Sequence, residues 1–425
     1  MERPTVHPAE EPSSGERSPA PTGGRRRRAL ILVEDLPVPF DRRVWAEAKT
    51  LRDAGWRMTV ISPKGTGATR WHERIDGIEV FRYPLPTTAA GFVNHLVEYA
   101  VAIPATLILA ILAWRGRRFH VVHACNPPDF FFPLGRLFQR LGSAFVFDQH
   151  DLAPEVYVAQ GGRRRGLVHR ALLWCERRTY RAADIVIATN ETYRRFALER
   201  GGVEPSRVFV VRSSPDPERI HRVEPDPALR RGRRFLVAYL GTMGPQDGVD
   251  LFVDAAALIA VERPGQVRFV AMGGGGELQR LRETVEARGL RDDVEFTGRV
   301  PDAEVRSVLS TADVAISPDP ANDFNEYCTM NKTLEYMATA TPVVAFDLEE
   351  TRVSAADAAE YAPPNDPTGL ARLVSELLDD PERRDRMGGI GLERIRGPLS
   401  WEMSARALLA AYDAAVAVRR RGAAS

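Results

Sequence analysis

A lysine and a glutamate at helical spacing give this sequence its clearest chemical signal. Lys332 and Glu335 lie in residues 331–338, whose apolar side chains recur as on one face of a helix. Pro342 ends the pattern before a β-branched segment, so we expect a helix followed by a buried strand. The N–H groups of a helix start attract an anion, Lys332 adds charge, and the Glu335 carboxylate can accept sugar hydroxyls. The pattern predicts either a nucleoside diphosphate site or an ordinary helix with solvated charges.

A second indication comes from the whole motif. The run N-K-x-x-E-Y-M-A-x-x-x-P-V-V, which begins at Asn331, resembles the nucleotide-sugar site of retaining glycosyltransferases of family 4. It is most similar to the bacterial subgroup that builds cell-surface polysaccharides. The resemblance extends from about Ala29 to the C-terminal helix. It implies an α/β protein of GT-B architecture, with two Rossmann-like domains facing a central cleft.

Composition limits the class of protein independently. A chain of 425 residues is too long for one core and favours two domains. With 44% hydrophobic and 27% charged residues it is typical of a globular enzyme, and a net charge of +1 gives no reason to expect nucleic acid as a partner. Three widely spaced cysteines without a C-x-x-C pair indicate neither a zinc site nor a disulfide framework. We therefore expect a cytoplasmic protein.

Apolar β-branched runs alternate with helical patterns in both halves of the chain, which predicts parallel sheets. The expected strands in the first half are residues 29–33, 58–61, 78–82, 121–125, 144–147, 184–188 and 208–211. Those in the second half are residues 235–240, 267–272 and 313–317, with two more that begin near residues 294 and 343. The predicted segments are a disordered tail (1–28), an acceptor domain (29–212), a linker (213–234), a nucleotide-sugar domain (235–398) and a helix crossing back with its tail (399–425).

His150 is the candidate catalytic residue. It follows a predicted strand, and ligands bind at the carboxyl ends of the strands in an α/β sheet. The family resemblance implies an active-site histidine at this H-D position. A histidine that only caps a loop is the alternative.

The resemblance also implies a set of donor-binding residues. They are Gly241, Thr242, Arg212, Arg299, Val300, Asn331, Lys332 and Glu335. Two positions depart from the family pattern. Asp247 stands where many relatives have lysine, which makes Lys332 and Arg212 the more important cations, and Glu326 is one place away from the usual first glutamate.

Residues 99–114 carry no charged side chain, and basic residues follow them. We expect a helix that is buried or dips into the membrane interface, in preference to a true span. Such a helix suits a lipid acceptor and peripheral contact with the inner face of the plasma membrane. The residues proposed for the acceptor or the membrane are Arg115, Arg117, Arg118, Arg163, Arg164 and Arg165, although solvated loops also have this composition.

The predicted activity is transfer of a sugar from a nucleotide diphosphate sugar to a polyprenyl-linked or glycan acceptor, with retention, in polysaccharide synthesis. No D-x-D pair lies in a suitable loop, so we expect neither a metal nor another cofactor. Two alternatives remain open. One is a sugar-nucleotide epimerase of the same fold, and the other is a catalytically decayed protein that binds nucleotide sugars.

Overall fold

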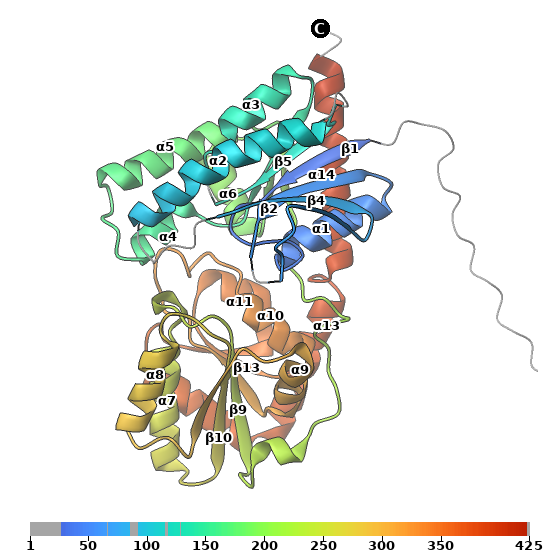
Figure 1. The fold of residues 1–425 in the computed structure, drawn as a ribbon. Coiled ribbons are helices and arrows are strands. Elements are labelled where there is room, and N and C mark those ends of the chain that lie inside the picture. The colour runs from blue at the N-terminus through green and yellow to red at the C-terminus, as the bar shows by residue number, and fades with distance from the viewer. Residues whose placement is uncertain (1–26, 66, 86–91, 115–117, 128, 423–425) are drawn as a thin grey trace, which may run out of the picture.

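The structure is a computed structural model that describes residues 27–65, 67–85, 92–114, 118–127 and 129–422. Two domains lie one above the other (Figure 1). The N-terminal domain contains β1 (Arg28–Leu32), α1 (Arg42–Asp53), β2 (Arg57–Pro63), β3 (His72–Ile75), β4 (Ile78–Tyr83), α2 (Phe92–Trp114), β5 (Val121–Cys125), α3 (Phe132–Arg140), β6 (Ala144–Gln149), α4 (Ala153–Ala159), α5 (Leu167–Ala182), β7 (Ile185–Ala188), α6 (Glu191–Glu199) and β8 (Val208–Val210).

The second half of the chain repeats the alternation of strand and helix. It contains β9 (Phe235–Leu240), α7 (Val249–Glu262), β10 (Val267–Met272), α8 (Leu278–Ala287), β11 (Val294–Gly298), α9 (Asp302–Thr311), β12 (Val314–Ser317), α10 (Asn331–Ala338), β13 (Val343–Phe346), α11 (Glu349–Ala355), β14 (Ala359–Ala362), α12 (Pro367–Asp379), α13 (Pro381–Arg396) and α14 (Trp401–Gly422). The predicted α/β class is confirmed.

Each sheet is an open, doubly wound sheet. The N-terminal strand order is β3-β4-β2-β1-β5-β6-β7-β8, and only the edge pair β3–β4 is antiparallel among the pairs between described strands. The C-terminal order is β11-β10-β9-β12-β13-β14, with parallel pairs. The order reverses beside β1 and beside β9. Ligands bind such sheets at the carboxyl ends of the strands next to the reversal, so the topology places a ligand site in each domain.

The apolar strands are explained by burial on both faces. Leu30 and Leu32 of β1 pack on one side with α2, α3 and α5, whereas Ala29 and Ile31 pack on the other side with α1 and α14. Alternate residues therefore serve two separate cores. The C-terminal sheet is covered in the same way, by α7 and α12 on one face and by α9, α10 and α13 on the other.

The last helix, α14, belongs to the N-terminal core although it follows the C-terminal domain in sequence. It runs alongside the N-terminal sheet (Figure 1, red). The indole Nε1 of Trp401 donates to Thr50 Oγ1 at 2.9 Å, and Arg419 pairs with Asp184 at 2.9 Å. This helix ties the two domains together.

The structure differs from the sequence prediction in several elements. Strand β3, helix α11 and strand β14 were not predicted, and β1 begins at Arg28, which the prediction assigned to the tail. Residues 1–26 of that tail lie outside the described residues. The predicted linker, 213–234, packs on the C-terminal domain, where Ile220 is buried in the core beside Leu236.

Helix α2 contains the uncharged segment, residues 99–114. Its Ala102, Ala110 and Ala113 are buried in the N-terminal core, while Ile108 and Ile111 are exposed. None of the helices within the described residues is long and apolar enough to cross a membrane. The segment is a surface helix with one buried face. The sequence pattern favours such a helix over one that spans a membrane.

Candidate active site

A cavity of about 610 Å³ lies between the two domains, at the carboxyl ends of both sheets. The N-terminal domain contributes the loop after β1, the start of α1, and residues that follow β6 and β7. The C-terminal domain contributes the loops after β9, β10 and β11 and the start of α10. The cavity therefore lies where the topology predicts ligand binding in both domains.

Most of the predicted site residues meet in this cavity. Its lining includes His150, Gly241, Thr242, Arg299, Val300, Asn331 and Glu335. Arg212 and Lys332 do not line it. Arg212 instead pairs with the buried Glu350 at 2.7 Å. Arg115 and Arg117 lie outside the described residues, and Arg118 follows α2, away from the cavity lining.

His150 is held by a buried carboxylate. Its Nε2 lies 2.7 Å from Asp148 Oδ2, and the other oxygen of Asp148 accepts from Arg43 Nη2 at 2.9 Å. Burial alone would lower the pKa of His150, but the charge and hydrogen bond of Asp148 raise it above the ordinary value. Burial would raise the pKa of Asp148, but Arg43 and His150 lower it well below its usual range. His150 is therefore favoured in its charged form at the cavity wall.

Two groups of side chains under His150 bring metal-ligating atoms within 4.8 Å of one another. One is Glu47, Asp148 and His150, and the other is His123, Cys125 and Asp148. Arg43 lies among them, at 2.9 Å from Asp148 and 3.2 Å from Glu47. Because this guanidinium already places a positive charge beside both acidic side chains, we assign no metal to the cluster.

Glu335 faces the cavity from the first turns of α10. Its Oε1 accepts from Arg42 Nη1 at 2.9 Å, an ion pair that joins the two domains across the cavity. The Glu335 side chain is 13% exposed and that of Arg42 is 59% exposed. Burial raises the pKa of Glu335, and Arg42 opposes the rise. An exposed arginine is easily displaced, so the carboxylate is accessible to a ligand with hydroxyl groups.

The start of α10 is open toward the same space. Met330 is the N-cap residue, and no side chain caps the helix. The neighbouring loops approach closely because they contain glycine: a Cβ at Gly273 would lie 1.8 Å from the Gly241 carbonyl oxygen. Backbone N–H groups and small residues thus line the C-terminal wall, an arrangement suited to an anion.

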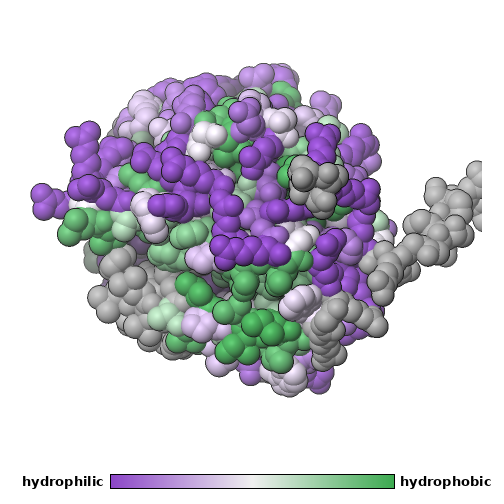
Figure 2. Space-filling view, turned by 90° about the horizontal axis from the view of Figure 1, so that it is seen from above, coloured by the Kyte–Doolittle hydropathy of each residue, from purple (hydrophilic) through white to green (hydrophobic). Residues whose placement is uncertain are grey.

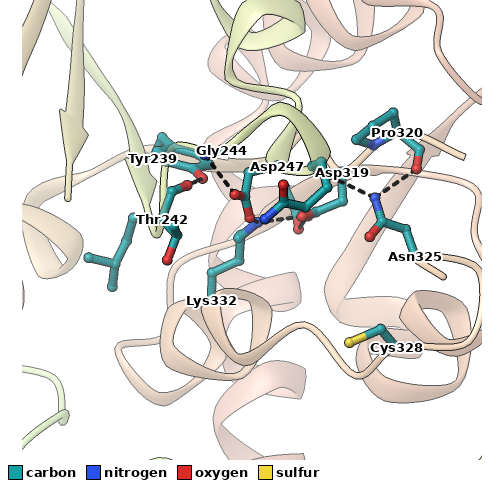
Figure 3. A network of polar contacts seen from close by, with 12 residues as sticks. Tyr239, Thr242, Gly244, Asp247, Asp319, Pro320, Asn325, Cys328 and Lys332 are labelled. Carbon is teal, nitrogen blue, oxygen red and sulfur yellow. Dashed lines mark hydrogen bonds and ion pairs between the residues drawn. The ribbon is translucent and has the colours of Figure 1, made fainter. Parts of the chain in front are cut away.

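Lys332 does not line this cavity, although it lies directly behind the wall, where a Cβ at Gly241 would come 3.1 Å from Lys332 Cε. It is 8% exposed, and its ammonium pairs with Asp319 and lies 3.9 Å from Asp247 (Figure 3). Burial alone would lower the pKa of Lys332, but Asp319 and Asp247 raise it. The sequence prediction placed this cation against a diphosphate, whereas the structure gives it partners within the protein.

Asp319 is the partner that sequence reasoning missed. It follows β12 by two residues, a position at the ligand edge of the sheet that offered a signal. Its other oxygen accepts from Ser317 at 2.6 Å. Asp247 also accepts from the Gly244 N–H at 2.9 Å, so the three charged residues hold the turn after β9 against α10.

Arg299 remains as the exposed cation of the donor side. It lines the cavity beside the turn after β10, near Gly274. No carboxylate pairs with it within the described part of the chain. Glu326, whose role the sequence left open, caps α11 by accepting from the Glu349 N–H at 3.1 Å and does not line the cavity.

Arg163, Arg164 and Arg165 lie in the loop between α4 and α5. Arg164 pairs across the domains with Asp323 at 3.2 Å. Arg118, by contrast, lies beside Gly142 at the end of α3. Among the described residues of these two sets, Arg118 and Arg164 therefore contact different parts of the molecule.

Known families match both halves of the chain. A family model described as "Glycosyl transferase 4-like domain" matches residues 41–213, and one described as "Glycosyl transferases group 1" matches residues 234–380. The chain is 29% identical to D-inositol 3-phosphate glycosyltransferase of Kineococcus radiotolerans over 57% of this chain and 59% of that protein, less than two thirds of its length. It is 27% identical to 2-deoxystreptamine N-acetyl-D-glucosaminyltransferase of Streptomyces fradiae, over 85% of this chain and 87% of the relative.

Solved structures agree on the fold. Sucrose-phosphate synthase from Thermosynechococcus elongatus superposes with a TM-score of 0.73 at 19% identity, covering 94% of this chain and 100% of that one. The two facing Rossmann-like domains define the GT-B fold of glycosyltransferases. The chain is a glycosyltransferase of this fold, and its two halves match the glycosyl transferase 4-like and the group 1 families.

Proposed function

We propose that this protein transfers a sugar from a nucleoside diphosphate sugar to an acceptor bound on the N-terminal side of the cavity, with retention at the anomeric carbon. The observation that supports this most is the set of anion-binding and hydroxyl-binding groups on the C-terminal wall. An uncapped helix start, the Glu335 carboxylate and the cation of Arg299 line one cavity opposite His150. A diphosphate, a ribose and a sugar present the groups that these residues bind.

In this proposal the leaving diphosphate is stabilised by the N–H groups of α10 and by Arg299, so that no metal is needed. Glu335 accepts hydrogen bonds from hydroxyl groups of the donor after Arg42 is displaced. His150 donates from the opposite wall to an oxygen of the donor or acceptor. Retention requires no protein nucleophile if the acceptor attacks the face from which the diphosphate leaves.

Product analysis tests the activity. A panel of nucleotide sugars is incubated with the protein and with polyprenyl phosphate, polyprenyl diphosphate and short glycan acceptors, and the products are separated by mass spectrometry. Free nucleoside diphosphate together with an enlarged acceptor supports transfer, with a Glu335→Gln variant as the inactive control. An isomerised donor indicates an epimerase, and donor binding without turnover indicates a decayed enzyme.

We further propose a lipid-linked acceptor, with peripheral contact at a membrane. The outer face of α2, α3 and α5 combines exposed apolar and basic side chains, and we call it the helical surface. It consists of Ile108, Ile111, Leu112, Leu137, Trp174, Arg118, Arg136, Arg140, Arg177 and Arg178. Figure 2 shows hydrophobic residues gathered beside charged ones on the N-terminal domain.

This surface differs from the one predicted by sequence. The ring centroids of Phe132 and Trp174 lie 5.8 Å apart, and Arg136 donates to the Arg181 carbonyl at 3.0 Å. Helices α3 and α5 therefore form one continuous face. Cations next to an anionic bilayer contribute about 1 kcal/mol each. Exposed apolar side chains can enter the headgroup region between them.

Liposome flotation tests the membrane proposal. Wild type is expected to float with anionic vesicles at low salt and to be released by high salt, because salt screens the arginines. Ile111→Asp and a double change of Arg136 and Arg140 to Ser should each reduce flotation. Leu258→Asp, at an exposed leucine of α7 in the other domain, is the matched control. Wild type that stays in the soluble fraction at low salt would remove the support for a lipid-linked acceptor.

A further inference from the structure

A buried polar cluster lies directly beneath His150, on the side of the N-terminal sheet covered by α1 and α14. Its members come from four elements and are all nearly inaccessible to solvent. They are Arg43 and Glu47 of α1, His123 of β5, Asp148 of β6 and Tyr412 of α14. Buried charges of this kind are costly unless they are paired, so their arrangement calls for a role beyond packing.

Asp148 is the centre of the cluster. Its Oδ2 lies 2.7 Å from His150 Nε2 and 3.4 Å from His123 Nε2, and its Oδ1 accepts from Arg43 at 2.9 Å. The Tyr412 hydroxyl lies 2.9 Å from His123 Nδ1. Burial lowers the pKa of His123, which favours the neutral form of this ring. A neutral ring that accepts from Tyr412 at Nδ1 carries its hydrogen on Nε2, toward Asp148.

We propose that Asp148 is a positioning residue that fixes both the orientation and the charge of His150. It binds Nε2 on the side away from the cavity, which leaves Nδ1–H of an imidazolium as the group offered to substrates. Arg43 holds the carboxylate in place. Tyr412 orients the His123 ring so that its Nε2–H faces the same carboxylate. The orientation of His150 is independent of the proposed function; the use of Nδ1–H in sugar transfer rests on it.

The surrounding charges are consistent with a charged His150. The groups that face it are Asp41 and Arg43 at the start of α1, Glu47 of α1, His123 of β5, Asp148 of β6 and the adjacent Asp151. Burial, followed by the charge of Asp148, raises the pKa of Glu47 to about 8. This rise favours the neutral form of Glu47, so Asp148 is the charged carboxylate that contacts both Arg43 and His150.

Nitrogen-15 labelling of histidine tests the proposal without any substrate. The ring nitrogens of His150, assigned by comparison with His150→Gln, are titrated by NMR in wild type, Asp148→Asn and Asp184→Asn. Asp184 is a matched control because its carboxylate also accepts a hydrogen bond and pairs with an arginine in the same domain. It lies at the amino end of β7, whereas His150 follows the carboxyl end of β6. We expect the pKa of His150 to fall in Asp148→Asn and to stay at the wild-type value in Asp184→Asn.

Activity provides a separate readout. Asp148→Asn should lower kcat by about tenfold or more while changing the donor KM less, because the substituted amide no longer holds the imidazolium. The pH at which activity falls should move to lower values with the pKa of His150. A loss of activity without these shifts would indicate a structural role and overturn the proposal.

Two further outcomes are decisive. A folded Asp148→Asn protein in which His150 titrates as in wild type overturns the assignment. If Asp148→Asn does not fold, wild type decides alone: the proposal requires a His150 pKa above about 6.5 with the proton retained on Nε2, and a lower value overturns it. Because the titration needs no donor, its failure is distinguishable from failure of the proposed transfer activity.

Discussion

The two walls of the cavity use charged residues in opposite ways. On the N-terminal wall, buried Asp148 and Arg43 support His150, whose ring still reaches the cavity. On the C-terminal wall, Lys332 is paired inside the protein with Asp319 and Asp247, and it does not reach the cavity. A charged residue at the carboxyl edge of a sheet therefore acts as a site residue only if its partners leave one of its atoms facing the ligand.

The difference has an energetic basis. A buried ion pair is approximately neutral for stability as a unit, but removing one partner leaves an uncompensated charge. The C-terminal cluster is complete without a ligand, and it fixes the turn after β9 against α10. The N-terminal cluster is complete only with His150, which joins it to the cavity. The following changes test this contrast, beginning with the largest expected effect.

Lys332→Met should destabilise the protein strongly. The change leaves Asp319 buried without its cation, which costs about 3–5 kcal/mol in the free energy of unfolding. The double variant Lys332→Met with Asp319→Asn should recover part of this loss. Chemical denaturation measures both, with Lys49→Met on α1 as the control. Full stability in Lys332→Met would show that the ammonium is not needed within the fold and would return it to the donor site.

Arg299→Ala should weaken nucleotide binding with little loss of stability. An exposed cation that hydrogen-bonds a phosphate contributes about 1.5–3 kcal/mol, or roughly tenfold or more in Kd. Calorimetric titration with a nucleoside diphosphate measures the change. Arg291→Ala is the control, since Arg291 is an exposed arginine of the same domain that does not line the cavity. Equal affinity in both variants would place the diphosphate elsewhere.

Glu47 gives the N-terminal wall a pH signature. Burial raises its pKa from 4.5 to about 8, so the folded protein holds a proton that the unfolded chain releases. This contribution to stability is complete below the unfolded pKa, falls as the pH rises between the two values, and is lost once the pH passes about 8. Glu47→Gln should remove up to about 1.4 kcal/mol per pH unit of this dependence. Denaturation curves at several pH values provide the measurement, and an unchanged slope would contradict it.

Arg42→Ala should have the smallest effect. The ion pair with Glu335 is exposed on the arginine side, so the free energy of unfolding should change by less than about 1 kcal/mol. Nucleotide affinity should rise slightly, because the carboxylate no longer has to exchange Arg42 for the ligand. Weaker binding in this variant would mean that Arg42 itself contacts the nucleotide.

Local patterns were sufficient for the long, buried elements. The bounds of β5, β9 and β10 agree with the prediction because each strand is a continuous apolar run between turn residues. The alanine-rich β14 and the polar edge strand β3 lack such a pattern and were missed. Their structure depends on neighbouring strands, which a local pattern does not reveal.

Site residues could be predicted where their position after a strand or within a helix indicated a role. His150 and Glu335 were found from their places after β6 and in α10, and both line the cavity. The partners of Lys332 and Arg43 were not found, because Asp319 and Asp148 are 13 and 105 positions away from them in sequence. Distant pairing of charges follows from the fold and has no local signal.

Titration of nucleoside diphosphates tests the central claim most directly. UDP, GDP and ADP are titrated calorimetrically into wild type and into Glu335→Gln. We predict that at least one binds wild type with one site per chain and binds Glu335→Gln more weakly, because an amide has one acceptor oxygen where the carboxylate has two. Folded wild-type protein that binds none of them, or that binds one equally well after the Glu335 change, would contradict the assignment of this cavity as a nucleotide-sugar site.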